Sequence, residues 1–136
     1  LLRRDIEVDI LPFCGEQKIG VIAYSPMQKG LLTGKITPEW VAKLAAADHR
    51  RSDPNFQEPK LSRNMEVVTG LQKIAARGRT VAQLAIAWVL RRPELTAAIV
   101  GARRPDQIEQ TAPAMDWELS SQDAASVEAL LLEHRL

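Results

Sequence analysis

Cysteine and histidine are scarce in this chain of 136 residues. The single cysteine, Cys14, excludes an internal disulfide, and no Cys/His pair has the spacing of a metal site. We expect both histidines, His49 and His134, on the surface, because one lies in a polar segment and the other near the C-terminus. No Ser/His/Asp arrangement can be assembled around them. The sequence therefore predicts a reduced protein without a metal site, and we assign no catalytic residue.

A charge bias and a long apolar run are missing as well. Eighteen Lys and Arg residues against seventeen Asp and Glu leave a net charge of +1, which argues against nucleic acid or an anionic membrane as the partner. No apolar run approaches the ~20 residues of a membrane-spanning helix. Acids and arginines occupy the first ten residues, where a signal peptide has an apolar core. We expect a cytoplasmic protein, and its 46% hydrophobic residues suit one globular domain.

Two short apolar runs, residues 19–24 and 96–100, predict strands. Both lack polar alternation, which is typical of strands in a parallel sheet. A helix is predicted over residues 6–18, with a break near Asp9 and an apolar stripe of Ile6, Ile10, Phe13 and Cys14. A second is predicted over residues 38–47 with Thr37 as its cap, and a third from Ser62 to before Gly78. Three more begin at Thr80, Pro105 and Ser120. The polar residues 49–60 predict a surface loop. This order of elements indicates an α/β fold with parallel strands.

Two strands are too few for a finished sheet. They cannot close a barrel, and an open pair leaves both edges and both faces uncovered. We expect the apolar faces of the strands to meet solvent in a lone monomer, together with the helical stripe of Val81, Leu84 and Trp88. The native protein should therefore contain extra residues, or associate with another copy or another piece of a barrel.

Each predicted strand is followed by a segment suited to a ligand, since ligands bind at the carboxyl ends of parallel strands. Residues 24–35 offer an aromatic ring, a hydroxyl, a lysine and two glycines. Residues 101–111 offer a glycine, two arginines and a helix N-terminus, which together suit a phosphate. Either segment alone is equally compatible with an ordinary turn or a solvated arginine pair. Two such strand ends in succession favour a ligand with a planar ring and phosphates.

These motifs resemble one family. Residues 19–26 and 30–35 resemble the seventh strand and following loop of aldo-keto reductases, and residues 80–90 resemble that family's seventh helix. Residues 99–107 are similar to its cofactor signature after the eighth strand, and residues 1–7 to the stretch past its sixth strand. The likeness covers essentially all 136 residues in the right order. It implies that residues 1–136 form the C-terminal part of a (β/α)8 TIM barrel, with the N-terminal part absent.

The resemblance also implies a function, the reduction of aldehydes or ketones by hydride transfer from NADPH. By that likeness Tyr24 stacks on the nicotinamide, Ser25, Met27, Lys29 and Leu31 follow the pyrophosphate, Arg103 and Gln107 hold the 2′-phosphate, Gly101 and Ala102 give backbone contacts, and Gln110 meets the adenine. Arg103 favours NADP over NAD, because a phosphate monoester suits a guanidinium partner.

The family's catalytic aspartate, tyrosine, lysine and histidine belong to the first half of its barrel, to which nothing here corresponds. Tyr24 is not the catalytic tyrosine. We therefore expect the chain to be inactive alone and to need an N-terminal barrel half or another copy as partner before it meets a small carbonyl substrate. The alternative is a non-catalytic nucleotide-binding or regulatory module of the same barrel family. Upstream sequence carrying the four catalytic residues would decide between the two.

Overall fold

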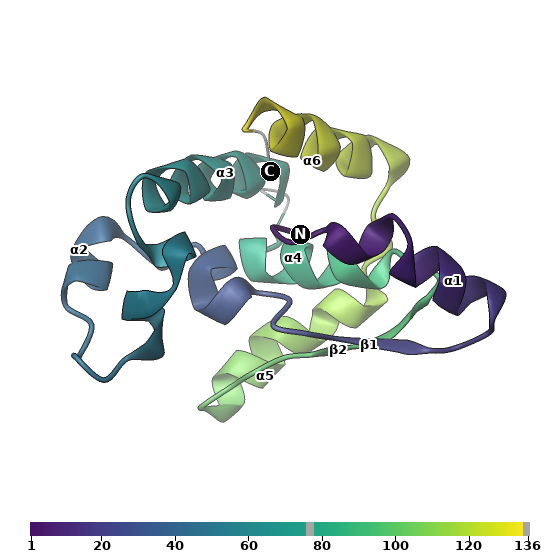
Figure 1. The fold of residues 1–136 in the computed structure, drawn as a ribbon, viewed down its shortest axis with the longest axis horizontal. Coiled ribbons are helices and arrows are strands. Elements are labelled where there is room, and N and C mark those ends of the chain that lie inside the picture. Colours follow the sequence, from purple (N-terminus) through teal and green to yellow (C-terminus); the bar gives the residue numbers. More distant parts are fainter. Residues whose placement is uncertain (76–77, 135–136) are drawn as a thin grey trace.

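The computed structural model describes residues 1–75 and 78–134. The helices are α1 (Ile10–Glu16), α2 (Pro38–Ala42), α3 (Lys60–Ala75), α4 (Val81–Leu90), α5 (Pro105–Thr111) and α6 (Ser121–Glu133), and the strands are β1 (Val21–Tyr24) and β2 (Leu95–Ile99). Short 3₁₀ turns cover Asp5–Glu7, Gln28–Thr33, His49–Ser52, Pro54–Phe56 and Ala112–Asp116. In Figure 1, α3 and α6 lie side by side, and α4 lies between them and the strands.

The two strands form a parallel pair, as the sequence predicts. Val21 pairs with Leu95 and Tyr24 with Ile99, with an irregularity after Val21. Because the strands are parallel, the loops that begin at Ser25 and Gly101 leave the sheet at the same end. This arrangement positions the site described below.

Most predicted helix starts are confirmed by capping contacts. Asp9 caps α1, Thr37 caps α2 and Ser120 caps α6. Thr80 and Gln83 form the predicted capping box of α4. The helix that follows Pro38 is shorter than predicted, since α2 ends at Ala42.

The prediction that Ser62 caps α3 was wrong. Helix α3 already begins at Lys60, so Ser62 lies inside its first turn. The Ser62 backbone N–H instead donates to a carboxylate oxygen of Glu58, 3.3 Å away. An upstream acidic side chain therefore takes the role that the sequence assigned to Ser62.

The main hydrophobic core lies between α3, α4 and α6. Its buried members include Val67, Leu71, Leu84, Trp88, Val127 and Leu131, none more than 1% exposed. The prediction that the Val81, Leu84 and Trp88 stripe meets solvent was therefore wrong. The chain covers this stripe with its own helices, because α3 and α6 pack against α4 and its neighbours.

Residues 49–60, which the sequence predicts as a surface loop, contain two 3₁₀ turns. Asp48 and Asp53 cap two 3₁₀ turns through their side chains. Phe56 is only 2% exposed and packs with Leu31, Ile36 and Leu61 in a second cluster. This buried aromatic side chain anchors the segment beside the loop that follows β1.

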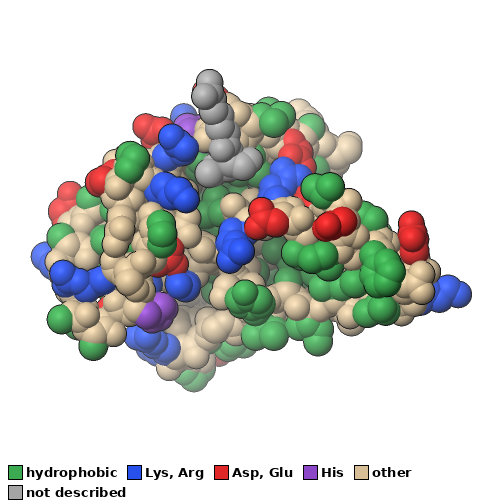
Figure 2. All heavy atoms as spheres, in the orientation of Figure 1, with side chains coloured by type: hydrophobic (Ala, Val, Ile, Leu, Met, Phe, Trp, Pro, Cys, Tyr) green, Lys and Arg blue, Asp and Glu red, His purple; other side chains and the backbone are tan. Residues whose placement is uncertain are grey.

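The sequence predicted that both faces of the strand pair are uncovered, but α4 packs against β2 and only one face remains uncovered. Ile22, Tyr24 and Ile99 are 57–77% exposed. The stripe predicted for the first helix also turns outward at Ile10 and Phe13, and Leu11 is buried instead. Figure 2 shows hydrophobic side chains gathered over the part of the surface that contains α1 and the strands. We call Ile10, Phe13, Ile22, Tyr24 and Ile99 the open apolar face.

Candidate functional site

A groove of about 660 Å³ lies at the carboxyl ends of the two strands. Nine of the ten residues predicted to bind a cofactor line it: Tyr24, Ser25, Met27, Lys29, Gly101, Ala102, Arg103, Gln107 and Gln110. Leu31 is the exception. Its side chain is fully buried in the cluster around Phe56 and does not line the groove.

The loop after β1 is unusual in its backbone. Ser25, Gln28 and Lys29 all have positive φ angles of 47–55°, which non-glycine residues rarely adopt. Gly30 continues the left-handed path with φ 96°. Such conformations persist only where the surroundings fix them. Here the Lys29 ammonium lies 2.8 Å from Oδ2 of Asp53, which ties this loop to the segment before α3.

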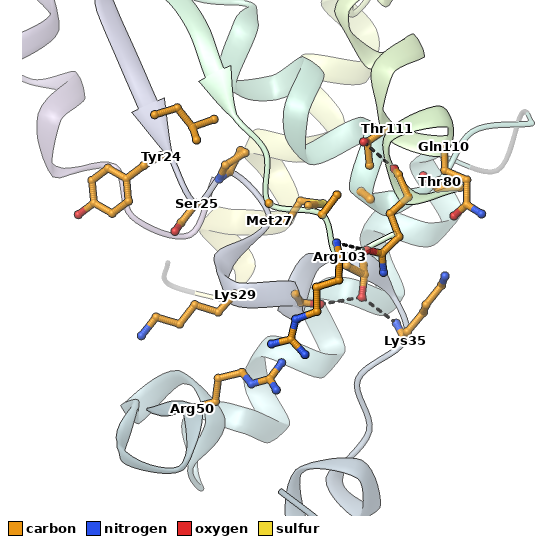
Figure 3. Close-up of a pocket in the computed structure, with 18 of the residues that line it drawn as sticks. Tyr24, Ser25, Met27, Lys29, Lys35, Arg50, Thr80, Arg103, Gln110 and Thr111 are labelled. Atoms are coloured by element: carbon orange, nitrogen blue, oxygen red, sulfur yellow. Dashed lines mark hydrogen bonds between the residues drawn. The ribbon is translucent and has the colours of Figure 1, made fainter. Parts of the chain in front are cut away.

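The loop after β2 is held by its own helix. The Arg103 backbone N–H donates to Oε1 of Gln107 over 2.7 Å, so this glutamine fixes the loop on the first turns of α5. Arg104 is occupied by Asp106 through two contacts of 2.9 Å, and this guanidinium lowers the pKa of the Asp106 carboxyl. Within the described residues, the Arg103 side chain forms no ion pair. Figure 3 shows its guanidinium extending into the groove.

Two more cationic residues line the groove: Lys35, at the end of the predicted ligand segment 24–35, and Arg50, which the sequence analysis missed. The Arg50 guanidinium donates to both carboxylate oxygens of Asp48, at 2.9 and 2.6 Å, and lies 4.7 Å from the ring centre of Trp40. These hydrogen bonds hold the pKa of Asp48 well below its usual value. The spacing of Asp48 and Arg50 could have suggested the pair, but no local pattern places it at the strand ends.

The charged side chains among the described residues that line the groove are all cationic: Lys29, Lys35, Arg50 and Arg103. Asp53 and Asp48 pair with Lys29 and Arg50 from outside this lining. Tyr24, at the end of β1, adds an aromatic ring that is 77% exposed. An exposed ring and guanidinium forks suit an anionic ligand that also carries a planar group.

The remaining predictions concern metal ions, histidines and membranes. No group of three metal-ligating side chains occurs in the described part of the chain. His49 is exposed at the groove, as expected of a surface residue, whereas His134 is largely covered and lies 3.5 Å from Glu66. Among residues 1–75 and 78–134, no helix has both the length and the apolar character needed to span a bilayer.

Comparison with known proteins identifies the family. The model of the aldo/keto reductase family matches residues 1–132. The chain belongs to this family. Its resemblance to aldo-keto reductases, inferred above from the strand-end motifs, is thereby confirmed.

Curated relatives include an aldo-keto reductase of Bacillus subtilis, YhdN, which is 35% identical over 133 residues (96% of this chain and 40% of that protein). An NADH-specific methylglyoxal reductase of Escherichia coli is 34% identical over 125 residues, 91% of this chain and 37% of the relative. The chain thus spans about two fifths of the length of these curated relatives.

A solved glycerol dehydrogenase from Gluconobacter oxydans has a similar fold. It superposes with a TM-score of 0.88 at 32% identity, over 97% of this chain and 40% of that structure. The predicted fold class is confirmed: the chain forms part of a (β/α)8 barrel, with two parallel strands and their flanking helices. Three residues of the open apolar face, Ile22, Tyr24 and Ile99, lie on these two strands.

Proposed function

We propose that the groove binds a nicotinamide dinucleotide as part of an aldo-keto reductase that reduces an aldehyde or ketone. One observation carries the proposal: nine predicted positions, separated by most of the chain, line one groove whose described lining residues include four cations and no carboxylate, with Lys29 and Arg50 paired to Asp53 and Asp48 from outside the lining. This set of donors fits a dinucleotide, which joins planar rings to phosphates. The cofactor, when bound, supplies the hydride for the reduction.

The residues after β1 hold the nicotinamide half. Tyr24 offers its exposed ring for stacking, and Ser25 with its positive φ starts a tight loop whose backbone can approach the ligand. Met27 and Lys29 follow along the pyrophosphate. The tie between Lys29 and Asp53 fixes the far side of this path.

The residues after β2 hold the adenosine half. Gly101 has open space where a side chain would stand, so its backbone and that of Ala102 are accessible to the ligand. Gln107 uses Oε1 on the Arg103 backbone and keeps its N–H donors for the phosphate. Gln110 presents an amide that can hydrogen-bond an adenine edge.

NADP is the cofactor that the charges favour. The Arg103 guanidinium has no carboxylate partner within the described residues and extends into the groove, where a 2′-phosphate would meet it. The Escherichia coli relative is NADH-specific, so the preference has to come from this chain's own side chains. Arg103 supplies a planar fork that fits a phosphate monoester, a group that NADPH carries and NADH lacks.

The rest of the reaction needs further protein. Among the described residues, the groove lining contains no carboxylate and one exposed histidine, so it contributes binding and orientation. We propose that the open apolar face, apart from the Tyr24 ring that is left for the cofactor, packs against other barrel strands, which supply the catalytic groups and the site for the carbonyl substrate. Another copy of this chain is the alternative cover for that face.

The test is a fluorescence titration of NADPH and NADH against a complete barrel that contains this segment, as wild type, Arg103→Ala and Arg104→Ala. Loss of a charge-assisted hydrogen bond costs about 1.5–3 kcal/mol, so Arg103→Ala should weaken NADPH binding by about tenfold to a hundredfold and leave NADH nearly unchanged. Arg104→Ala should do much less, because Asp106 already occupies Arg104. Equal weakening of both cofactors by Arg103→Ala would refute the assignment of the phosphate to Arg103.

A further inference from the structure

Gln83 connects two helices of the groove from outside the lining that the structure describes. Its side-chain Oε1 accepts the Thr80 backbone N–H over 2.9 Å and so completes the capping box of α4. At the other end of the same amide, Nε2 donates to the Gln110 backbone carbonyl over 2.8 Å. One side chain therefore ties the start of α4 to the end of α5, and both of the residues that it ties line the groove.

The Gln110 carbonyl needs a donor from outside its own helix. Helix α5 ends at Thr111, and the last four carbonyl groups of a helix receive no N–H from a following helical turn. Pro113, three residues after Gln110, has no backbone N–H to offer. The two partners also fix the orientation of the Gln83 amide, because a reversed amide would set its NH₂ group against the Thr80 N–H and its oxygen against the Gln110 carbonyl.

The other contacts at this end of α5 do not replace the bond from Gln83. The Thr111 hydroxyl donates to the Gln107 carbonyl over 2.8 Å, which is a contact within α5. Ala114 is 1% exposed and anchors the following 3₁₀ turn, but apolar packing is non-directional, whereas a hydrogen bond fixes an angle as well as a distance. Figure 3 shows Thr80, Gln110 and Thr111 together at the end of the groove away from Tyr24.

We propose that Gln83 is a positioning residue that holds Gln110 in place for the adenine ring of the dinucleotide. The inference rests on the proposed cofactor site. Adenine presents its amine as a donor beside a ring nitrogen that accepts, and a side-chain amide can match both groups at once. The Gln110 side chain is exposed, so its backbone has to be fixed if the amide is to meet that edge at the right place and angle.

Fluorescence titration of a complete barrel that contains this segment tests the proposal with NADPH and its hypoxanthine analogue. The analogue has an oxygen in place of the adenine amine, so the two probes differ at the base edge and carry the same phosphates. The wild type should bind NADPH about threefold to tenfold more tightly than the analogue. Gln83→Glu should remove most of this preference, because glutamate keeps the acceptor for the Thr80 N–H but has no N–H for the Gln110 carbonyl. The added negative charge acts on both probes alike.

Further variants separate positioning from the stability of the fold. Gln83→Ala loses both the cap and the bond to α5, so it should melt at a lower temperature than Gln83→Glu and yet lose the preference to the same extent. Ser120→Ala removes the hydroxyl that caps α6, outside the described groove lining, and should lower the melting temperature without changing the preference. Gln110→Ala should abolish the preference, and adding Gln83→Glu to it should cause no further loss, because Gln83 acts through Gln110.

The outcomes distinguish this inference from the proposed function. A wild type that binds NADPH and the analogue equally, or a preference that Gln83→Glu leaves intact, would overturn the role of Gln83 and keep the cofactor site. A preference that falls in proportion to the melting temperature across Gln83→Glu, Gln83→Ala and Ser120→Ala would also overturn it, because Gln83 would then act only on the fold. A wild type that binds neither probe would overturn both proposals.

Discussion

Arg4 and Glu128 form a two-pronged ion pair between the start of the chain and α6, with Nη1–Oε2 and Nη2–Oε1 distances of 2.5 and 2.9 Å. Arg4 also donates to Glu7, and Arg91 stacks on Trp88 with its guanidinium carbon 3.4 Å from the ring centre. These charges join the first residues to α4 and α6. The N-terminal segment is thus fixed on the helical side of the fold, and α1 continues from it along the open apolar face.

Acid should weaken this network. Burial acts to raise the pKa of Glu7, but the Arg4 hydrogen bond and the charges of Arg4 and Arg91 outweigh it, so the pKa lies below the usual 4.5. The stabilisation is complete above the unfolded pKa and is lost as the pH falls through the lower folded value, because the unfolded chain binds the proton first. Urea unfolding at about pH 7 and about pH 3 should show lower stability in acid.

The matched variants are Glu7→Gln and Glu133→Gln. Glu7→Gln should lose about 1 kcal/mol at neutral pH and show a shallower loss in acid. Glu133 is exposed at the end of α6 and has no ion pair within the described residues, so its variant should follow the wild type. If Glu7→Gln and wild type lose equal stability in acid, Glu7 does not carry the pH dependence.

Thr80→Ala should destabilise the protein by about 1 kcal/mol, because it removes the side chain that accepts the Gln83 backbone N–H at the start of α4. Thr69→Ala is the control, since its hydroxyl only donates back to the Met65 carbonyl within α3. Its effect should stay within about 0.5 kcal/mol. Denaturant midpoints at a common slope measure both changes, and equal midpoints for the two variants would argue against the capping box as a source of stability.

Gly34→Ala tests the loop that carries Lys35 to the groove. Gly34 has φ 74°, and an added Cβ would lie 3.1 Å from Nε2 of Gln72. The left-handed backbone alone should cost about 1–2 kcal/mol in an alanine variant. Gly101→Ala, with open space around its Cβ position, should change thermal stability little. A neutral Gly34→Ala would mean that the loop can move to an ordinary backbone conformation.

The open apolar face should make the isolated 136-residue chain associate and bind an apolar dye such as anilinonaphthalene sulfonate. Ile22→Ser should reduce both the dye fluorescence and the sedimentation coefficient of the associated species, because Ile22 is 59% exposed on that face. Leu132→Ser is the control, since Leu132 is 74% exposed on α6. A compact monomer that melts cooperatively and binds no dye would contradict this expectation.

Local signals in the sequence predicted much of the fold. Apolar runs marked both strands, and Thr37, Thr80 and Ser120 marked helix starts, because a cap depends on residues only two or three positions apart. Ser62 failed because the acidic side chain of Glu58 meets its backbone from outside the predicted helix. The stripe of Val81, Leu84 and Trp88 was predicted to meet solvent because the spacing of apolar residues in one helix does not show which other helices pack against it.

The sequence likewise predicted the groove residues next to the strand ends and failed for those whose position depends on distant packing. Residues next to the strand ends, such as Tyr24 and Arg103, were found because parallel pairing brings both ends together. Arg50 was missed because its place depends on Phe56, which docks an irregular segment in the core. Leu31 was assigned to the groove by resemblance, but the left-handed turn at Lys29 and Gly30 precedes a side chain that points into the core.

The pairing of Val21 with Leu95 has a kinetic consequence. The contacts among α3, α4 and α6 join residues that are closer together in the chain than the paired residues of β1 and β2. The two strands can pair only when the whole stretch between them has folded or forms a loop. Closing such a long loop is entropically costly, so folding rates fall as contacts become more distant in sequence. The strand pair should therefore form after the contacts among these helices during refolding. Because the groove exists only when both strand ends meet, the appearance of nucleotide binding during refolding should report on the pairing of the strands.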